Sequence, residues 1–186
     1  MYLNCLMRST ILSVITDKIV LLQLRFRYKY GILWSIIVIR KGTKSMIKRE
    51  LYMSRIRPFI GSDLIKVMTG IRRCGKSVML ELIKQELIES GVSPIQFISI
   101  NFEDMSYSHL QTAQALHDEI TQKVAEIEGK VYLFFDEIQE VRDWEKCINS
   151  FRVSLDCDIY ITGSNAKLLS GELATYLGGR YVEFVI

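Results

Sequence analysis

The amino-acid sequence predicts an α/β fold of three layers, α/β/α, with a central parallel sheet of five strands. Short apolar segments alternate along the chain with longer segments of helical periodicity, which is the order expected of a parallel sheet covered on both faces. One segment, Val131–Phe135, is apolar throughout, as a strand buried on both faces requires. The chain has 186 residues, of which 49% are hydrophobic and 24% charged, enough for one globular domain with a real core.

The first helix is expected over Ile47–Arg57, because its apolar residues have helical spacing and Pro58 then ends it. Leu64–Thr69 is short and mostly apolar and is expected to be the first strand. The second helix, Lys76–Ser90, carries its apolar residues on one face and is followed by Gly91, a common stop residue. The remaining elements continue the alternation of strand and helix. In order they are Pro94–Asn101, Ser108–Ile127, Val131–Phe135, Trp144–Leu155, Asp158–Thr162, Ala166–Tyr176 and Tyr181–Ile186.

Residues 1–45 differ from the rest of the chain in charge. They contain eight Lys or Arg and one Asp, a net charge of +7, so that the remainder carries −4 of the total of +3. Their apolar runs are too short for a membrane span of about 20 residues, and no signal-peptide cleavage site follows them. We expect an atypical N-terminal extension over 1–45 and the main domain over 46–186. Met46–Glu50 looks like a natural protein start, which suggests that the extension arises from a start site assigned too early.

The composition gives few grounds for a metal, disulfide or nucleic-acid site. The net-acidic main domain offers no electrostatic argument for nucleic acid, and the alternating basic and aromatic residues of Arg25–Tyr30 are too few to predict a site. None of the cysteines has CxxC spacing, so reduced thiols in a cytoplasmic protein are expected. The four cysteines are Cys5, Cys74, Cys147 and Cys157.

The loop between the first strand and the second helix fits the P-loop motif G-x-x-x-x-G-K-[ST] at every fixed position. Its residues are Gly70, Ile71, Arg72, Arg73, Cys74, Gly75, Lys76 and Ser77. Glycines let the backbone N–H groups face the phosphates, and the positive end of the following helix adds to the attraction. Lys76 is predicted to reach the β- and γ-phosphates, and Ser77 to bind Mg²⁺. Arg72 and Arg73 occupy variable positions, where solvated side chains are expected, with contact to the nucleotide or to a partner as the alternative. Cys74 also occupies a variable position and is expected to be simply tolerated there. The alternative is a reactive thiol whose pKa is lowered by the helix start and Lys76.

Two acids follow the apolar strand Val131–Phe135, in the pattern of a Walker B motif. Asp136 is predicted to hold Mg²⁺, and Glu137 to orient or activate the attacking water. Because ligands bind at the carboxyl ends of parallel strands, polar residues after the next strand are further candidates. Ser164 and Asn165 are predicted to contact the γ-phosphate or the water, or else to cap the next helix.

Three other features have roles that the residues alone leave open. Arg180 is a candidate for stabilising transition-state charge, in its own chain or in a neighbouring subunit, with a surface arginine as the alternative. The acids of Asn101–Asp104 either lie near the nucleotide or cap the next segment. Trp144 is expected to pack in the core rather than to act in the site.

Taken together, these segments resemble the prokaryotic AAA-type ATPases whose N-terminal ATPase domain is followed by a C-terminal domain of unknown function. The residues that carry the resemblance are Thr69–Ser77, Asn101–Asp104, Phe135–Gln139, Trp144, Ile161–Asn165, Ser170–Leu173 and Gly179-Arg180. The resemblance implies a P-loop NTPase fold, a sensor-like role for Ser164 or Asn165, and a chain truncated before the lid and the C-terminal domain. A missing lid would affect hydrolysis more than binding.

Two functions are compatible with the sequence. The first is an ATPase that binds Mg·ATP and hydrolyses it to drive a conformational change; the second is an ATP-dependent switch or interaction module with negligible turnover. A small-molecule kinase is a third hypothesis, but no substrate lid is apparent. No guanine-recognition element of the N/T-K-x-D type is found, so ATP is favoured. The expected partners are a second copy of the chain or another protein, with neither nucleic acid nor a membrane indicated.

Overall fold

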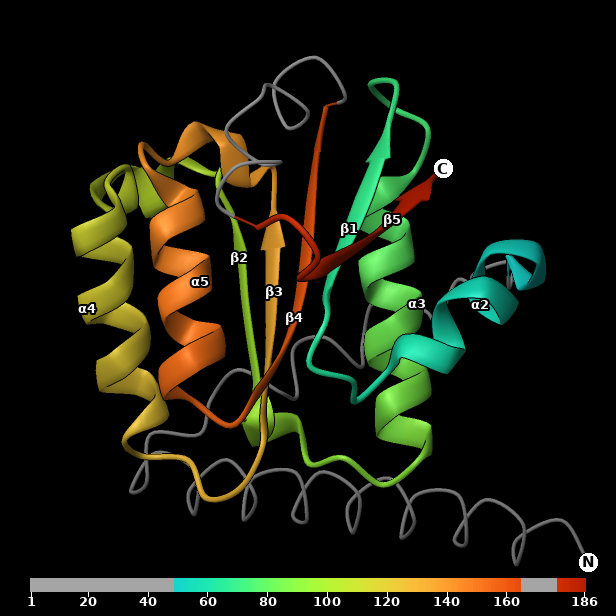
Figure 1. Ribbon diagram of the computed structural model, residues 1–186, viewed down its shortest axis with the longest axis horizontal. Helices are drawn as coiled ribbons and strands as arrows, with labels where there is room; N and C mark the ends of the chain where they lie inside the picture. The colour runs from blue at the N-terminus through green and yellow to red at the C-terminus, as the bar shows by residue number, and fades with distance from the viewer. Residues whose placement is uncertain (1–48, 165–176) are drawn as a thin grey trace, which may run out of the picture. The chain divides into compact units, whose positions relative to one another are not determined.

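Five parallel strands form one sheet, and helices cover both of its faces (Figure 1). The computed structural model describes residues 49–164 and 177–186, which belong to one compact unit. The strands are β1 (Ile65–Gly70), β2 (Phe97–Asn101), β3 (Val131–Asp136), β4 (Cys157–Ser164) and β5 (Tyr181–Val185). Their order across the sheet is β2-β3-β4-β1-β5. The predicted α/β class with a five-stranded parallel sheet is therefore confirmed.

Four α-helices form the outer layers in the described part of the chain. Helices α2 (Glu50–Ile56) and α3 (Lys76–Glu89) cover one face of the sheet, and α4 (Ala113–Val124) and α5 (Trp144–Ser154) cover the other (Figure 1). None of the helices within residues 49–164 and 177–186 is long and apolar enough to cross a membrane.

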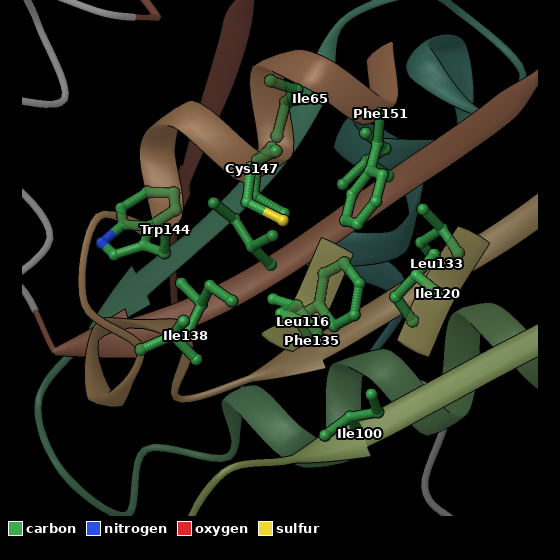
Figure 2. Packing of buried hydrophobic residues seen from close by; sticks show 14 of the residues in the cluster. Ile65, Ile100, Leu116, Ile120, Leu133, Phe135, Ile138, Trp144, Cys147 and Phe151 are labelled. Carbon is green, nitrogen blue, oxygen red and sulfur yellow. The ribbon is translucent and has the colours of Figure 1, made fainter. Parts of the chain in front are cut away.

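The period-2 alternation of the strands divides the core between the two faces. Leu133 and Phe135 of β3 point to the α4/α5 face, whereas Phe134 points to the α2/α3 face. On the α4/α5 face, α5 packs against β4, and its Phe151 ring meets Phe135 of β3 at a centroid distance of 6.3 Å (Figure 2). Trp144 belongs to this cluster and is 4% exposed, so its expected packing role is confirmed. The central strands are thus fixed from both sides, which holds their carboxyl ends in one rigid edge.

Two predicted elements are shorter in the structure, because local side-chain hydrogen bonds cap a neighbouring turn or helix. Pro94–Gln96 forms a 3-10 helix instead of the start of β2, with the Gln96 side chain accepting a hydrogen bond from the Ser93 N–H at 3.0 Å. The helix predicted over Ser108–Ile127 is divided into a 3-10 helix, Met105–Leu110, and α4. Thr112 separates the two because its hydroxyl caps α4, accepting from Ala115 N–H at 3.3 Å.

Other bounds differ by a few residues. Helix α2 begins at Glu50 and is followed by a 3-10 turn, Arg57–Phe59, that contains Pro58. The helix predicted over Ala166–Tyr176 lies outside the described residues, as does the predicted extension over 1–45.

Candidate functional site

The register of the sheet brings the predicted motifs to one edge. Gly70 at the end of β1 pairs with Ser164 at the end of β4, and Asp136 at the end of β3 pairs with Asn101 at the end of β2. Because the strands are parallel, the P-loop and Walker B segments leave the sheet on the same side. Sequence positions far apart in the chain therefore converge on the N-terminus of α3.

Glycines are required at two positions of the P-loop. Gly70 has φ +153°, and a Cβ there would lie 2.7 Å from Cys74 Sγ and 2.8 Å from the Ile186 carbonyl oxygen. Gly75 has φ +100°, and a Cβ there would lie 2.5 to 2.8 Å from the guanidinium atoms of Arg49. At Gly70, both the backbone conformation and the Ile186 carbonyl oxygen disfavour a side chain. At Gly75 the left-handed backbone conformation is the main reason, because the end of the flexible Arg49 side chain can move away.

Arg49, which lies outside the motif, contacts this loop and stabilises it. Its Nη1 donates a hydrogen bond of 2.8 Å to the Cys74 carbonyl oxygen, and its guanidinium lies against Gly75. The residue directly precedes α2, so the start of that helix is placed against the P-loop. The P-loop carbonyl is satisfied by this contact, which stabilises the loop in one conformation.

Lys76, the first residue of α3, provides a buried cation at the P-loop. Its side chain is 5% exposed, and its Nζ lies 3.5 Å from the carbonyl oxygens of Gly70 and Ile71. The same Nζ lies 3.5 Å from Glu137 Oε1. These contacts are long for a buried ammonium group, which favours close anionic partners. The positive end of α3 adds to this attraction, so the site is electrostatically suited to phosphate.

Thr162 of β4 holds the two Walker B acids together. Its Oγ1 donates to Asp136 Oδ1 and accepts from the Glu137 N–H at 3.0 Å. Glu137 has a left-handed conformation, with φ 55° and ψ 49°. Both Thr162 and Asp136 are buried, at 0% and 7% exposed. The hydroxyl therefore fixes one acid directly and the other through its backbone.

A cleft of about 250 Å³ opens beside these residues. It is lined by Arg72, Lys76, Glu103, Glu137, Gln139, Glu140 and Ser164. Gln139 Nε2 donates to Glu137 Oε2 at 2.6 Å, so the Glu137 carboxylate lies between a lysine and an amide. A buried lysine, a carboxylate and a backbone rich in N–H donors in one cleft are suited to phosphoryl chemistry.

The residues present fit Mg²⁺ as it binds in nucleotide sites. Ser77 is exposed at the second position of α3, and Asp136 ends β3, which β4 separates from β1 in the sheet. Within residues 49–164 and 177–186, no three His, Cys, Asp or Glu residues gather into a metal site. Mg²⁺ in nucleotide sites takes one or two protein ligands and completes its shell with phosphates and water, so a hydroxyl and a carboxylate are ligands of the right type for it.

The remaining predicted site residues have different positions. Arg72 and Arg73 are exposed, as expected for loop arginines, and Arg72 Nη2 lies 3.5 Å from Glu103 Oε1 in the cleft. Asp104 caps the following 3-10 helix by accepting from the Ser106 N–H at 2.9 Å, and this contact lowers the pKa of its carboxyl group. Asn165 lies outside the described residues.

Arg180 is not brought to the cleft. It precedes β5, whose first residue, Tyr181, pairs with Ile65 at the start of β1. The P-loop leaves the other end of β1, about 17 Å away at about 3.3 Å per residue. Arg180 Nη1 instead donates to Asn149 Oδ1 of α5 at 2.9 Å. The geometry thus gives no support to a role in its own chain, whereas a contact with a second copy stays a prediction.

Three residues of the site were missed from the sequence: Arg49, Gln139 and Thr162. Thr162 lies in Ile161–Asn165, one of the segments that carry the resemblance, but the predicted polar contacts fell on Ser164 and Asn165. A signal was available for Thr162, since a hydroxyl that ends a buried strand needs a partner. For Arg49 and Gln139, nothing in the local sequence indicates a contact with the P-loop or with Glu137.

The sequence is similar to a known protein family and to proteins of two other organisms. Residues 62–186 match a family model described as an AAA domain. An uncharacterized protein of Haemophilus influenzae is 45% identical over 144 residues, and one of Methanocaldococcus jannaschii is 38% identical over 119 residues. These matches cover 77% and 64% of this chain but only 36% and 25% of the relatives. The chain thus spans about a third or less of their length.

A solved structure shares the fold at low sequence identity. The crystal structure of Saccharomyces cerevisiae RIF2 matches with a TM-score of 0.51 and 14% identity, over 76% of this chain and 56% of that one. At this identity the match supports the fold alone.

Proposed function

Because this chain belongs to the AAA domain family, and is therefore a nucleotide-binding domain of the P-loop NTPase class, we propose that it binds Mg·ATP and hydrolyses it to drive a conformational change. The observation that carries the proposal is the convergence of Lys76 and Glu137 in one cleft, with their charged atoms 3.5 Å apart. A cation for phosphate and a carboxylate for water thus occupy neighbouring positions.

Each part of the site has a role in this proposal. The N–H groups of Gly70–Ser77 bind the phosphates, and Lys76 exchanges its contact with Glu137 for the γ-phosphate. Glu137 then accepts a proton from the attacking water. Ser77 and Asp136 would hold Mg²⁺, which when bound supplies positive charge against the phosphate oxygens. Ser164 would contact the γ-phosphate or the water, a role that its place in the cleft lining supports.

An alternative function is an ATP-dependent switch with negligible turnover. It is favoured by the Lys76–Glu137 contact, which in the free protein engages the candidate base with the phosphate-binding lysine. Under this alternative, nucleotide binding would break the contact and report occupancy without catalysis. Either function would suit a cytoplasmic protein that assembles with itself or with another protein, with Arg180 acting in a neighbouring copy.

The first experiment titrates the full chain with a fluorescent ATP analogue, with and without Mg²⁺. Lys76→Ala should weaken binding about 10- to 150-fold, since hydrogen bonds to charged groups contribute about 1.5–3 kcal/mol. Lys123→Ala, which removes an exposed lysine on α4, is the matched control and should bind normally. A folded wild-type protein that does not bind ATP would refute the proposal.

Measuring phosphate release distinguishes the ATPase from the ATP-dependent switch. Glu137→Gln should retain Mg·ATP binding and abolish phosphate release if the protein is an ATPase. If the wild-type protein binds Mg·ATP but releases no phosphate above background, the switch is the correct function.

A further inference from the structure

Gln139 carries a buried polar atom that nothing in the described protein satisfies. It lies in the 3-10 helix Ile138–Glu140, immediately after the left-handed residue Glu137. Its Oε1 is buried and has no hydrogen-bond partner within residues 49–164 and 177–186. The same side chain lines the cleft together with Lys76 and Glu137. A buried acceptor without a partner is costly, and its position in this cleft indicates a ligand that donates a hydrogen bond.

The orientation of the Gln139 amide is fixed by its neighbour. Nε2 lies 2.6 Å from Glu137 Oε2, at hydrogen-bond distance from a carboxylate that accepts only. Exchanging the nitrogen and oxygen of the amide would bring two oxygen atoms together at this distance. The unpartnered atom is therefore the oxygen, and what it lacks is a donor.

The Glu137 carboxylate has two described side-chain partners that differ in strength. Oε1 lies 3.5 Å from Lys76 Nζ, beyond a good hydrogen bond, whereas Oε2 accepts from Gln139 at 2.6 Å. A phosphate attracts the charged ammonium group of Lys76 more strongly than the neutral amide of Gln139. When Lys76 turns to a phosphate, Gln139 is the partner that continues to hold the carboxylate.

We propose that Gln139 is a positioning residue: its Nε2 holds Glu137, and its Oε1 accepts a hydrogen bond from the water that Glu137 activates. This inference rests on the proposed ATPase function. In the step, the water oxygen bonds to the γ-phosphorus and a water proton passes to Glu137. The bond from the γ-phosphorus to the bridging oxygen breaks, and its electron pair leaves with ADP. Gln139 neither gives nor takes a proton, but it fixes the positions of both reacting groups.

The test compares variants of the full chain in steady-state ATP hydrolysis and in Mg·ATP binding. Gln139→Leu removes both amide contacts and should lower kcat about 10- to 100-fold, while the Kd for Mg·ATP changes less than about twofold. Gln139→Glu keeps an acceptor but places a second carboxylate against Glu137, so it should not rescue kcat. Gln114→Leu is the matched control, because the exposed Gln114 side chain donates to Asp118 of its own helix and does not line the cleft, so this variant should turn over normally.

A purely structural role predicts a different result. Gln139→Leu would then weaken Mg·ATP binding and thermal stability together, or leave kcat within about twofold of the wild type; either outcome overturns the inference.

The hydrogen bond from Gln139 to Glu137 is tested by protein stability, without ATP hydrolysis. A failure of this inference can therefore be distinguished from a failure of the proposed function. In the free protein, urea midpoints are compared for Glu137→Ala, Gln139→Leu and the double variant. The double variant should lose less than the two single variants together, and additive losses refute the contact. A wild-type protein that binds Mg·ATP without hydrolysing it would refute the ATPase and the water contact, whatever the urea result.

Discussion

Thr162→Val tests whether one buried hydroxyl holds both Walker B acids. Valine has nearly the shape of threonine but can neither donate to Asp136 nor accept from the Glu137 N–H, the two contacts that Thr162 makes. Losing a hydrogen bond to a charged group costs about 1.5–3 kcal/mol, and an unsatisfied buried N–H about 1–3 kcal/mol. The added apolar burial of valine offsets part of this, so we expect a net loss of about 2–4 kcal/mol in the free energy of unfolding.

Thr162→Ser is the matched control. Serine keeps the hydroxyl and deletes one methyl group at a fully buried position, which costs about 1 kcal/mol. Urea denaturation measures both variants, and phosphate release measures their turnover. Thr162→Val should lose most of its turnover because Glu137 is no longer fixed, whereas Thr162→Ser should retain it. If serine is as damaging as valine in both assays, the effect comes from packing and the role given to the hydroxyl is wrong.

Two further predictions concern a buried ion pair and the brace of the P-loop. Lys66 and Asp158 are both 0% exposed and paired at 2.5 Å, so Asp158→Ala, which leaves the lysine charge unpaired, should cost about 3–5 kcal/mol in urea denaturation. The double variant Lys66→Met/Asp158→Leu should lose less than the two single changes together, and a simple sum would contradict the buried-pair account. Arg49→Ala removes the hydrogen bond to the Cys74 carbonyl and should weaken Mg·ATP binding about three- to tenfold. Arg49→Lys should bind with intermediate affinity, and unchanged affinity of the alanine variant would remove Arg49 from the site.

The elements predicted best are those whose signal lies within a few neighbouring residues. Val131–Phe135 is apolar in every position and is predicted as a strand because no other element needs such a run; the structure extends it by one residue, to Asp136. The P-loop is predicted because its glycines, lysine and serine have fixed spacing. The predicted start of the second strand at Pro94 was wrong, because Pro94–Gln96 forms a local 3-10 turn that competes with the strand.

The limit of sequence-based prediction is sharpest at Glu137. Its identity as an acid after a buried strand is visible in the sequence, but its left-handed backbone is not, because non-glycine residues adopt that conformation at a cost of about 1–2 kcal/mol. Thr162, 25 residues away, supplies the hydrogen bond to the Glu137 N–H that helps to offset this cost. The left-handed turn in turn places Gln139 where its amide reaches the carboxylate.

The role of Arg49 also depends on a residue far away in the sequence. It contacts Cys74 across 25 residues, and only the packing of α2 against the sheet brings it there. The residues that carry phosphate chemistry are therefore readable as a motif, because their roles depend on the backbone of one continuous loop. The residues that position the motif side chains depend instead on how separate helices and strands pack together. It follows that substitutions of Arg49, Thr162 or Gln139 should alter the geometry of binding or turnover while the P-loop and Walker B motifs remain intact in the sequence.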